Sequence, residues 1–80
     1  MTAAELLAAI DAAIAGRWED AHRMVQQDET DPKAAWIHAV LHKSEGDLEN
    51  ARYWYRRAGR TADVSRDPQD ELRAIRASIV

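Results

Sequence analysis

The sequence feature that most constrains the fold is a short pattern that occurs twice. The pattern Gly-x-x-Glu-x-Ala is found at residues 16–21 and again at residues 46–51, an offset of 30 residues. An internal offset of this size is typical of helical repeats, in which each unit is a pair of helices. In both copies the glycine lies between two stretches with helical periodicity, and glycine commonly ends a helix because it adopts a positive φ without strain. The chain is therefore expected to contain two helical hairpins that turn at these glycines.

Helix start signals divide the chain further. Thr2 and Glu5 have the spacing of a capping box. The pairs Asp31-Pro32 and Asp67-Pro68 place a capping carboxylate before a proline at the first helical position. Together with the apolar periodicity, these signals predict helices near residues 3–15, 18–28, 32–45, 48–58 and 68–79. We expect one all-α domain over residues 1–80, with a hairpin at 3–28, a hairpin at 32–59, a connector at 60–66 and a C-terminal helix at 67–80 that caps the stack.

Small residues are expected where the helices approach closely. The sequence has no Phe, and Ala supplies many of its apolar residues. A supply of this kind suits thin helices that pack tightly, because few large side chains are present to fill a wide core. Ala21 and Ala51 occupy equivalent positions in the two copies, and the stretch after Gly46 also directs Tyr55 inward. We predict structural roles for Gly16, Ala21, Gly46, Ala51, Tyr55 and Ala58.

Residues 3–59, and most clearly residues 46–59, resemble a tetratricopeptide (TPR) helical repeat. Trp36 matches the first position of the TPR signature, and Gly46-Asp47 resembles the turn between its helices. Ala51 and Tyr55 match the spacing of the second helix, with Ala58 at its second small position. The stretch from residue 36 to residue 60 is also similar to small bacterial proteins that have no assigned function. The TPR resemblance implies two antiparallel hairpins that form a scaffold for a peptide or a protein and catalyse no reaction themselves.

The distribution of charge and aromatic residues suggests where such a partner binds. Residues 1–50 carry four basic and ten acidic side chains, whereas residues 51–80 carry seven arginines and four acids. This division is typical of solvated helix faces that differ in sign, and it is also suited to steering an acidic partner to the C-terminal half. For an interaction module we expect an acidic or extended peptide as the natural partner and a self-associated dimer as the most available one. The net charge of -3 argues against nucleic acid. The predicted contact residues are Trp36, Arg52, Tyr53, Trp54 and Arg56.

Two histidines form the second candidate site. His38 and His42 are four residues apart and Glu45 follows, so all three lie along one side of the predicted helix. Neutral imidazoles at this spacing bind zinc or nickel. A ligand set from one helix leaves the coordination incomplete unless His22 or a second chain contributes. The alternative interpretation is that these histidines lie at a helix contact or on the surface and form local hydrogen bonds.

The sequence gives little support for catalysis. It contains no Gly-rich phosphate loop, no Gly-x-Ser-x-Gly elbow and no His-Glu-x-x-His motif. It has no cysteine, which excludes disulfides and thiolate sites and agrees with a reducing compartment. No apolar run approaches the roughly 18 residues that a membrane span requires. The sequence therefore predicts a cytoplasmic interaction module without catalysis. The alternative is a protein that binds a metal or small molecule, or an enzyme, that uses the face carrying His38 and His42.

Overall fold

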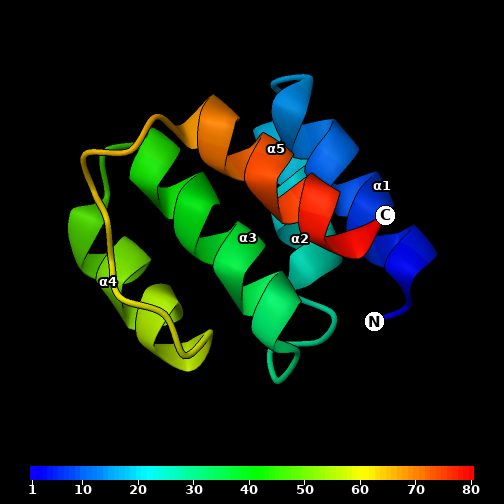
Figure 1. Cartoon of the computed structure of the whole chain (residues 1–80), viewed down its shortest axis with the longest axis horizontal. Coiled ribbons are helices and arrows are strands. Elements are labelled where there is room, and N and C mark those ends of the chain that lie inside the picture. The colour runs from blue at the N-terminus through cyan, green and yellow to red at the C-terminus, as the bar shows by residue number, and fades with distance from the viewer.

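The computed structural model describes all 80 residues and contains five α-helices and no strand (Figure 1). The all-α prediction is confirmed. The helices are α1 (Ala3–Ile14), α2 (Trp18–Val25), α3 (Pro32–Ser44), α4 (Leu48–Arg57) and α5 (Pro68–Ile79). No helix of the structure combines the length and the apolar character that crossing a membrane requires.

The predicted helix bounds hold to within one residue except at the end of α2, which was expected near residue 28. The helix stops at Val25 because the Asp28 side chain forms hydrogen bonds that a further helical turn does not allow. The Asp28 carboxylate accepts hydrogen bonds from the Thr30 hydroxyl at 2.7 Å and from the amino group of Met1 at 2.9 Å. Asp and Thr commonly form such local bonds in place of a further helical turn.

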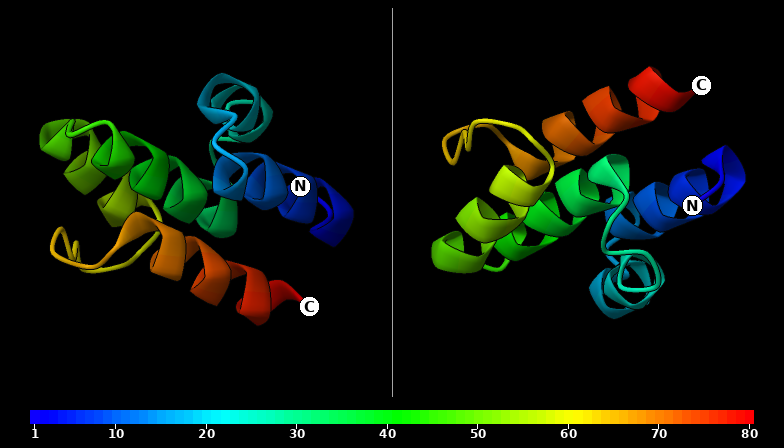
Figure 2. Two further views of the ribbon diagram at one scale, coloured as in Figure 1. Left: turned by 90° about the horizontal axis from the view of Figure 1, so that it is seen from above. Right: turned by 90° about the horizontal axis from the view of Figure 1, so that it is seen from below.

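Helix α3 is the centre of the fold and packs against each of the other four helices. Helix α4 returns antiparallel along α3, while α5 lies against α3 and α1 from another side (Figures 1 and 2). Both panels of Figure 2 show α2 almost end-on while α1 lies across the page. The pair α3–α4 is therefore a hairpin of the expected kind, whereas α2 crosses α1 at a wide angle.

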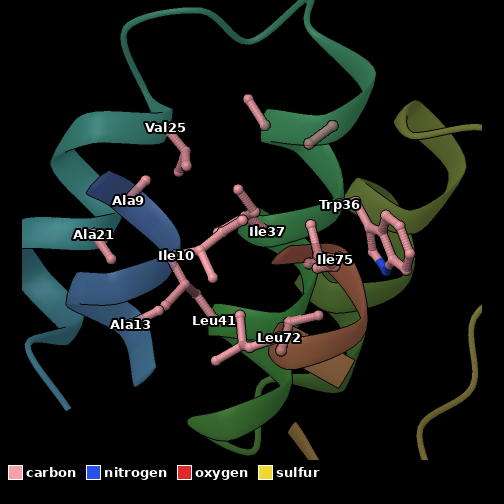
Figure 3. Close-up of a cluster of buried hydrophobic side chains, with 14 of the residues drawn as sticks. Ala9, Ile10, Ala13, Ala21, Val25, Trp36, Ile37, Leu41, Leu72 and Ile75 are labelled. Carbon is pink, nitrogen blue, oxygen red and sulfur yellow. The ribbon is translucent and has the colours of Figure 1, made fainter. Parts of the chain in front are cut away.

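The C-terminal helix, which the sequence predicts as the cap of the stack, packs on both hairpins. The backbone of α5 packs on α1 and α3 and not on α4. The reason is its apolar stripe: Leu72 and Ile75 are 3% and 0% exposed. They point toward Ile10 of α1 and toward Ile37 and Leu41 of α3 (Figure 3). Helix α5 thus completes the main core of the molecule.

The two glycine turns have the same geometry, as the repeated pattern predicts. Gly16 and Gly46 have φ angles of 82° and 79°. The amide of the residue after each glycine donates to the carbonyl five residues before that residue. This bond is typical of helices that end with a residue in the left-handed conformation. These bonds run from Arg17 to Ala12 at 2.9 Å and from Asp47 to His42 at 3.0 Å. Ala21 and Ala51, which follow the glycines at equal distances, are both 0% exposed.

A buried polar network attaches α5 to the hairpin. Both Glu71 carboxylate oxygens accept hydrogen bonds from the Tyr55 hydroxyl, at 2.7 and 2.8 Å, and one accepts from the Trp36 indole at 2.8 Å. Lys43 forms an ion pair with Glu71 and donates to the Asp63 carbonyl at 2.9 Å. Burial and the neighbouring Glu71 carboxylate raise the pKa of Tyr55, so its hydroxyl stays a donor. The network therefore gives every buried charge in it a partner.

Candidate metal centre

The structure brings together all three histidines of the chain. His22 comes from α2, and His38 and His42 come from successive turns of α3. One ring nitrogen from each lies within 4.8 Å of the others. The Nε2 atoms of His22 and His38 are 3.0 Å apart. The crossing of α2 over α3 therefore supplies the third imidazole that a site on one helix lacks.

Glu45 does not belong to this group, although the sequence suggested it as a ligand beside His38 and His42. It is the C-cap residue of α3, beyond the last helical residue, and its side chain is exposed. The chain turns away at Gly46 directly afterwards. The third member of the group is His22, which the sequence offered as an additional ligand.

Two tryptophans hold the histidine rings in place. The ring of Trp18 stacks on that of His22 with centroids 4.6 Å apart, and Trp54 stacks on His38 at 3.8 Å. The Trp18 indole also donates to the Leu41 carbonyl at 2.7 Å. This carbonyl lies in the last turn of α3, where helices leave carbonyl groups without an intrahelical partner. Trp18 thus fastens the start of α2 to the end of α3.

The surroundings keep two of the histidines neutral. His38 is 2% exposed, and burial, followed by the neighbouring imidazoles of His22 and His42, lowers its pKa to about 3. Burial also lowers the pKa of His22, with a smaller contribution from His42. Neutral imidazole is the form that binds metal ions. The Nδ1 atom of His38 is buried and has no hydrogen-bond partner.

The spacing of the histidine nitrogens suits a transition metal ion. With zinc–nitrogen distances of about 2.0–2.1 Å, two imidazole nitrogens on one tetrahedral ion lie about 3.3 Å apart. The separation of 3.0 Å between His22 and His38 is close to this value. No pair in the group exceeds 4.8 Å, about 1.5 Å more than two ligands of one tetrahedral ion, so the rings have to approach one another for all three nitrogens to bind it. The three residues therefore form a candidate ligand set.

The predicted partner surface is only partly present. Trp36 and Trp54 were expected as contact residues, but they are 6% and 9% exposed. Trp36 is held by Glu71 and covered by the guanidinium of Arg60, 3.4 Å from its ring centroid. Trp54 is covered by its stacking on His38. Both rings are therefore unavailable to a partner in this structure.

The other three predicted contact residues remain on the surface of α4. Tyr53 is 42% exposed, and Arg52 and Arg56 are exposed beside it. The arginines that form ion pairs are different ones: Arg23, Arg73 and Arg76. Arg52 and Arg56 thus present free positive charge on one ridge of α4.

Comparisons with known proteins identify no relative of the chain. No model of a protein family, no curated protein and no solved structure matches it. The TPR resemblance stays a prediction from the sequence.

Proposed function

We propose that the protein binds a divalent transition metal ion through His22, His38 and His42. The observation that carries the proposal is the convergence of three imidazoles from two helices within 4.8 Å. Imidazole nitrogen favours zinc, nickel and copper, whereas magnesium and calcium prefer oxygen ligands. We name zinc and nickel as the ions to test first.

The protonation of the site supports this proposal. His38 is neutral at pH 7 because its pKa is lowered to about 3. The Nε2 atoms of His22 and His38 face each other at 3.0 Å, so one proton is shared between two nitrogens. A metal ion would bind between the two Nε2 atoms if the ring that carries this proton instead carries it on Nδ1, which leaves both Nε2 lone pairs for the ion.

Calorimetric titration of protein without an affinity tag tests the proposal. We expect one zinc or nickel ion to bind per chain, and no heat from magnesium. Each of the variants His22→Gln, His38→Gln and His42→Gln is expected to weaken binding about tenfold or more, since each removes one of three ligands. Glu45→Gln is the matched control, because this carboxylate lies outside the group, and its affinity should equal that of the wild type. Absence of binding at micromolar protein, or equal affinity in the histidine variants, contradicts the proposal.

A second function, the binding of a protein partner, is favoured by the exposed ridge of Arg52, Tyr53 and Arg56 on α4. Two unpaired arginines beside an exposed aromatic ring suit an acidic or extended peptide, or an acidic surface on a second copy of the chain. The absence of cysteine agrees with a cytoplasmic location for such a module. On this proposal the ridge acts without catalysis.

Charge reversal distinguishes this second function from the first. Light scattering across protein and salt concentration measures self-association, and titration with a glutamate-rich peptide measures peptide binding. Arg52→Glu/Arg56→Glu is expected to abolish either interaction and to leave zinc binding unchanged. Arg17→Glu/Arg66→Glu, at exposed positions away from the ridge, is the control. A monomer that binds no peptide, or equal behaviour of the two double variants, contradicts the proposal.

A further inference from the structure

Beyond the three ligands, we propose that Asp47 is a positioning residue of the metal site. Its carboxylate lies 3.8 Å from Nδ1 of His42 and favours a proton on that nitrogen, so that the Nε2 lone pair of the ring is left for the metal ion. This inference rests on the proposed metal-binding function. It concerns how the site is prepared for the ion and not which ion binds.

The backbone turn places this carboxylate beside the ring. Gly46 takes a left-handed conformation, with φ 79°, and the chain reverses immediately after α3. The Asp47 amide then donates to the carbonyl of His42 at 3.0 Å. The backbone of Asp47 is therefore bonded to the backbone of His42. The Oδ2 atom of Asp47 lies 3.8 Å from Nδ1 of His42. The sequence Gly-Asp at the turn is thus sufficient to place an acid next to a histidine one turn earlier.

The chemistry of a histidine ligand gives this contact its role. A neutral imidazole carries its proton on one nitrogen, and only the other nitrogen is able to bind a metal ion. Histidine ligands in metal sites almost always donate the remaining N–H to a carboxylate, a carbonyl or water, which fixes both the tautomer and the ring orientation. The separation of 3.8 Å is longer than a direct hydrogen bond. Metal binding makes the ring N–H a stronger donor. The Oδ2 atom of Asp47 accepts from the Asn50 side chain at 2.7 Å, and it would add or exchange that bond for one from the ring N–H.

Asp47 also has a structural role, from which the positioning role must be separated. It is the N-cap residue of α4: its Oδ1 atom accepts from the Asn50 amide at 3.3 Å, and its Oδ2 atom accepts from the Asn50 side chain at 2.7 Å. Asparagine caps a helix about as well as aspartate. Asp47→Asn therefore keeps the cap and removes the charged acceptor that faces His42.

The experiment combines nitrogen NMR of the imidazoles with zinc titration. The chain has only three histidines, and the single glutamine variants of His22 and His38 assign their signals. We expect His42 of the metal-free wild type to carry its proton on Nδ1. In Asp47→Asn the proton is expected to shift toward Nε2, and zinc affinity is expected to fall about tenfold or more. The urea midpoint of the metal-free variant should stay near that of the wild type, because the cap is retained.

Two control variants are compared with Asp47→Asn. Asn50→Ala removes the cap contact on Oδ2 but keeps the carboxylate, and Glu45→Gln removes an equal charge that touches no histidine. Both are expected to keep the wild-type tautomer and affinity. An unchanged tautomer and affinity in Asp47→Asn, with binding still lost in His38→Gln, overturns the role of Asp47 and leaves the proposed function intact. A wild-type protein that binds no zinc overturns both.

Discussion

Among single residues, His38 links the site most directly to the stability of the fold. Its pKa is about 3 in the folded chain, against an ordinary value of 6.5. Between these values the unfolded chain binds a proton that the folded chain does not, so acidification from pH 6.5 toward pH 3 destabilises the fold. The slope is up to about 1.4 kcal/mol per pH unit for one such group. His22, whose pKa is also lowered, contributes in the same direction.

Urea unfolding of the metal-free protein at about pH 7 and about pH 5 measures this effect. His38→Phe keeps an aromatic ring beside Trp54 but does not titrate, so its free energy of unfolding is expected to fall less over this interval. This pH interval also distinguishes the titration of histidines from the titration of acidic side chains. The pKa of Asp28 is lowered to about 2 from 3.8, so its contribution disappears only at a lower pH. Equal slopes for wild type and His38→Phe would show that this histidine does not couple to folding.

Glu71 is the second residue with a large predicted effect. Glu71→Gln leaves the buried ammonium of Lys43 without a carboxylate, and breaking a buried ion pair on one side costs about 3–5 kcal/mol. The paired change Lys43→Met/Glu71→Gln removes both charges and is expected to be more stable than Glu71→Gln alone. Urea denaturation of the wild type, the single variants Lys43→Met and Glu71→Gln, and the double variant gives the coupling energy. A Glu71→Gln protein within about 1 kcal/mol of the wild type would show that Lys43 is solvated by other means.

At the scale of the helices, the close contacts at Ala51 and Ala21 are the points to test. Both alanines are fully buried and lie in the first turn of the helix that follows the glycine, Ala21 in α2 and Ala51 in α4. Ala51→Leu forces a larger side chain into the contact between α4 and α3 and is expected to cost about 1–3 kcal/mol. Ala77→Leu, at an exposed position of α5, is the control and should change the thermal midpoint little. An unchanged midpoint in Ala51→Leu would mean that the contact yields without strain.

The helices themselves could be predicted because their signals are local. The Thr2–Glu5 box and the caps at Asp31 and Asp67 depend on a few neighbouring residues, and each forms in the structure. The end of α2 and the position of α5 depend instead on contacts that are distant along the chain, such as that of Asp28 with the amino group of Met1. Periodicity shows which face of α5 is apolar but does not show which helices that face covers.

At the scale of the whole molecule, metal binding is expected to stabilise the fold. A ligand that binds only the folded state at about 100 times its dissociation constant contributes about 2.7 kcal/mol. For a domain of this size that corresponds to a rise of the thermal midpoint on the order of 10 °C. Thermal unfolding with zinc, and again after a chelator is added, measures the rise and its reversal. His38→Gln should show no rise, and a rise of equal size in this variant would place the stabilising ion elsewhere.

The sequence predicts the two histidines of α3 as ligands but does not show that α2 brings His22 to them. The i, i+4 spacing of His38 and His42 is visible in the sequence because one helix carries both. His22 joins them only because α2 crosses α3, and no local pattern states that angle. The burial of Trp54 has the same reason. The sequence predicted this residue as a contact residue, but the packing of α4 against α3 stacks its ring on His38. The burial of Lys43 likewise depends on Glu71, 28 positions later.

That separation of 28 positions also affects how the protein is made. A ribosome releases the chain from its N-terminal end, so Lys43 and Tyr55 leave the exit tunnel before Glu71 does. During that interval the hairpin of α3 and α4 has no anion for its ammonium group, and Lys43 must stay in contact with water. The final burial of these side chains therefore waits for α5. A delay after Tyr55 has left the ribosome and before Glu71 has left it would prolong the incompletely closed state and its exposure to chaperones and proteases.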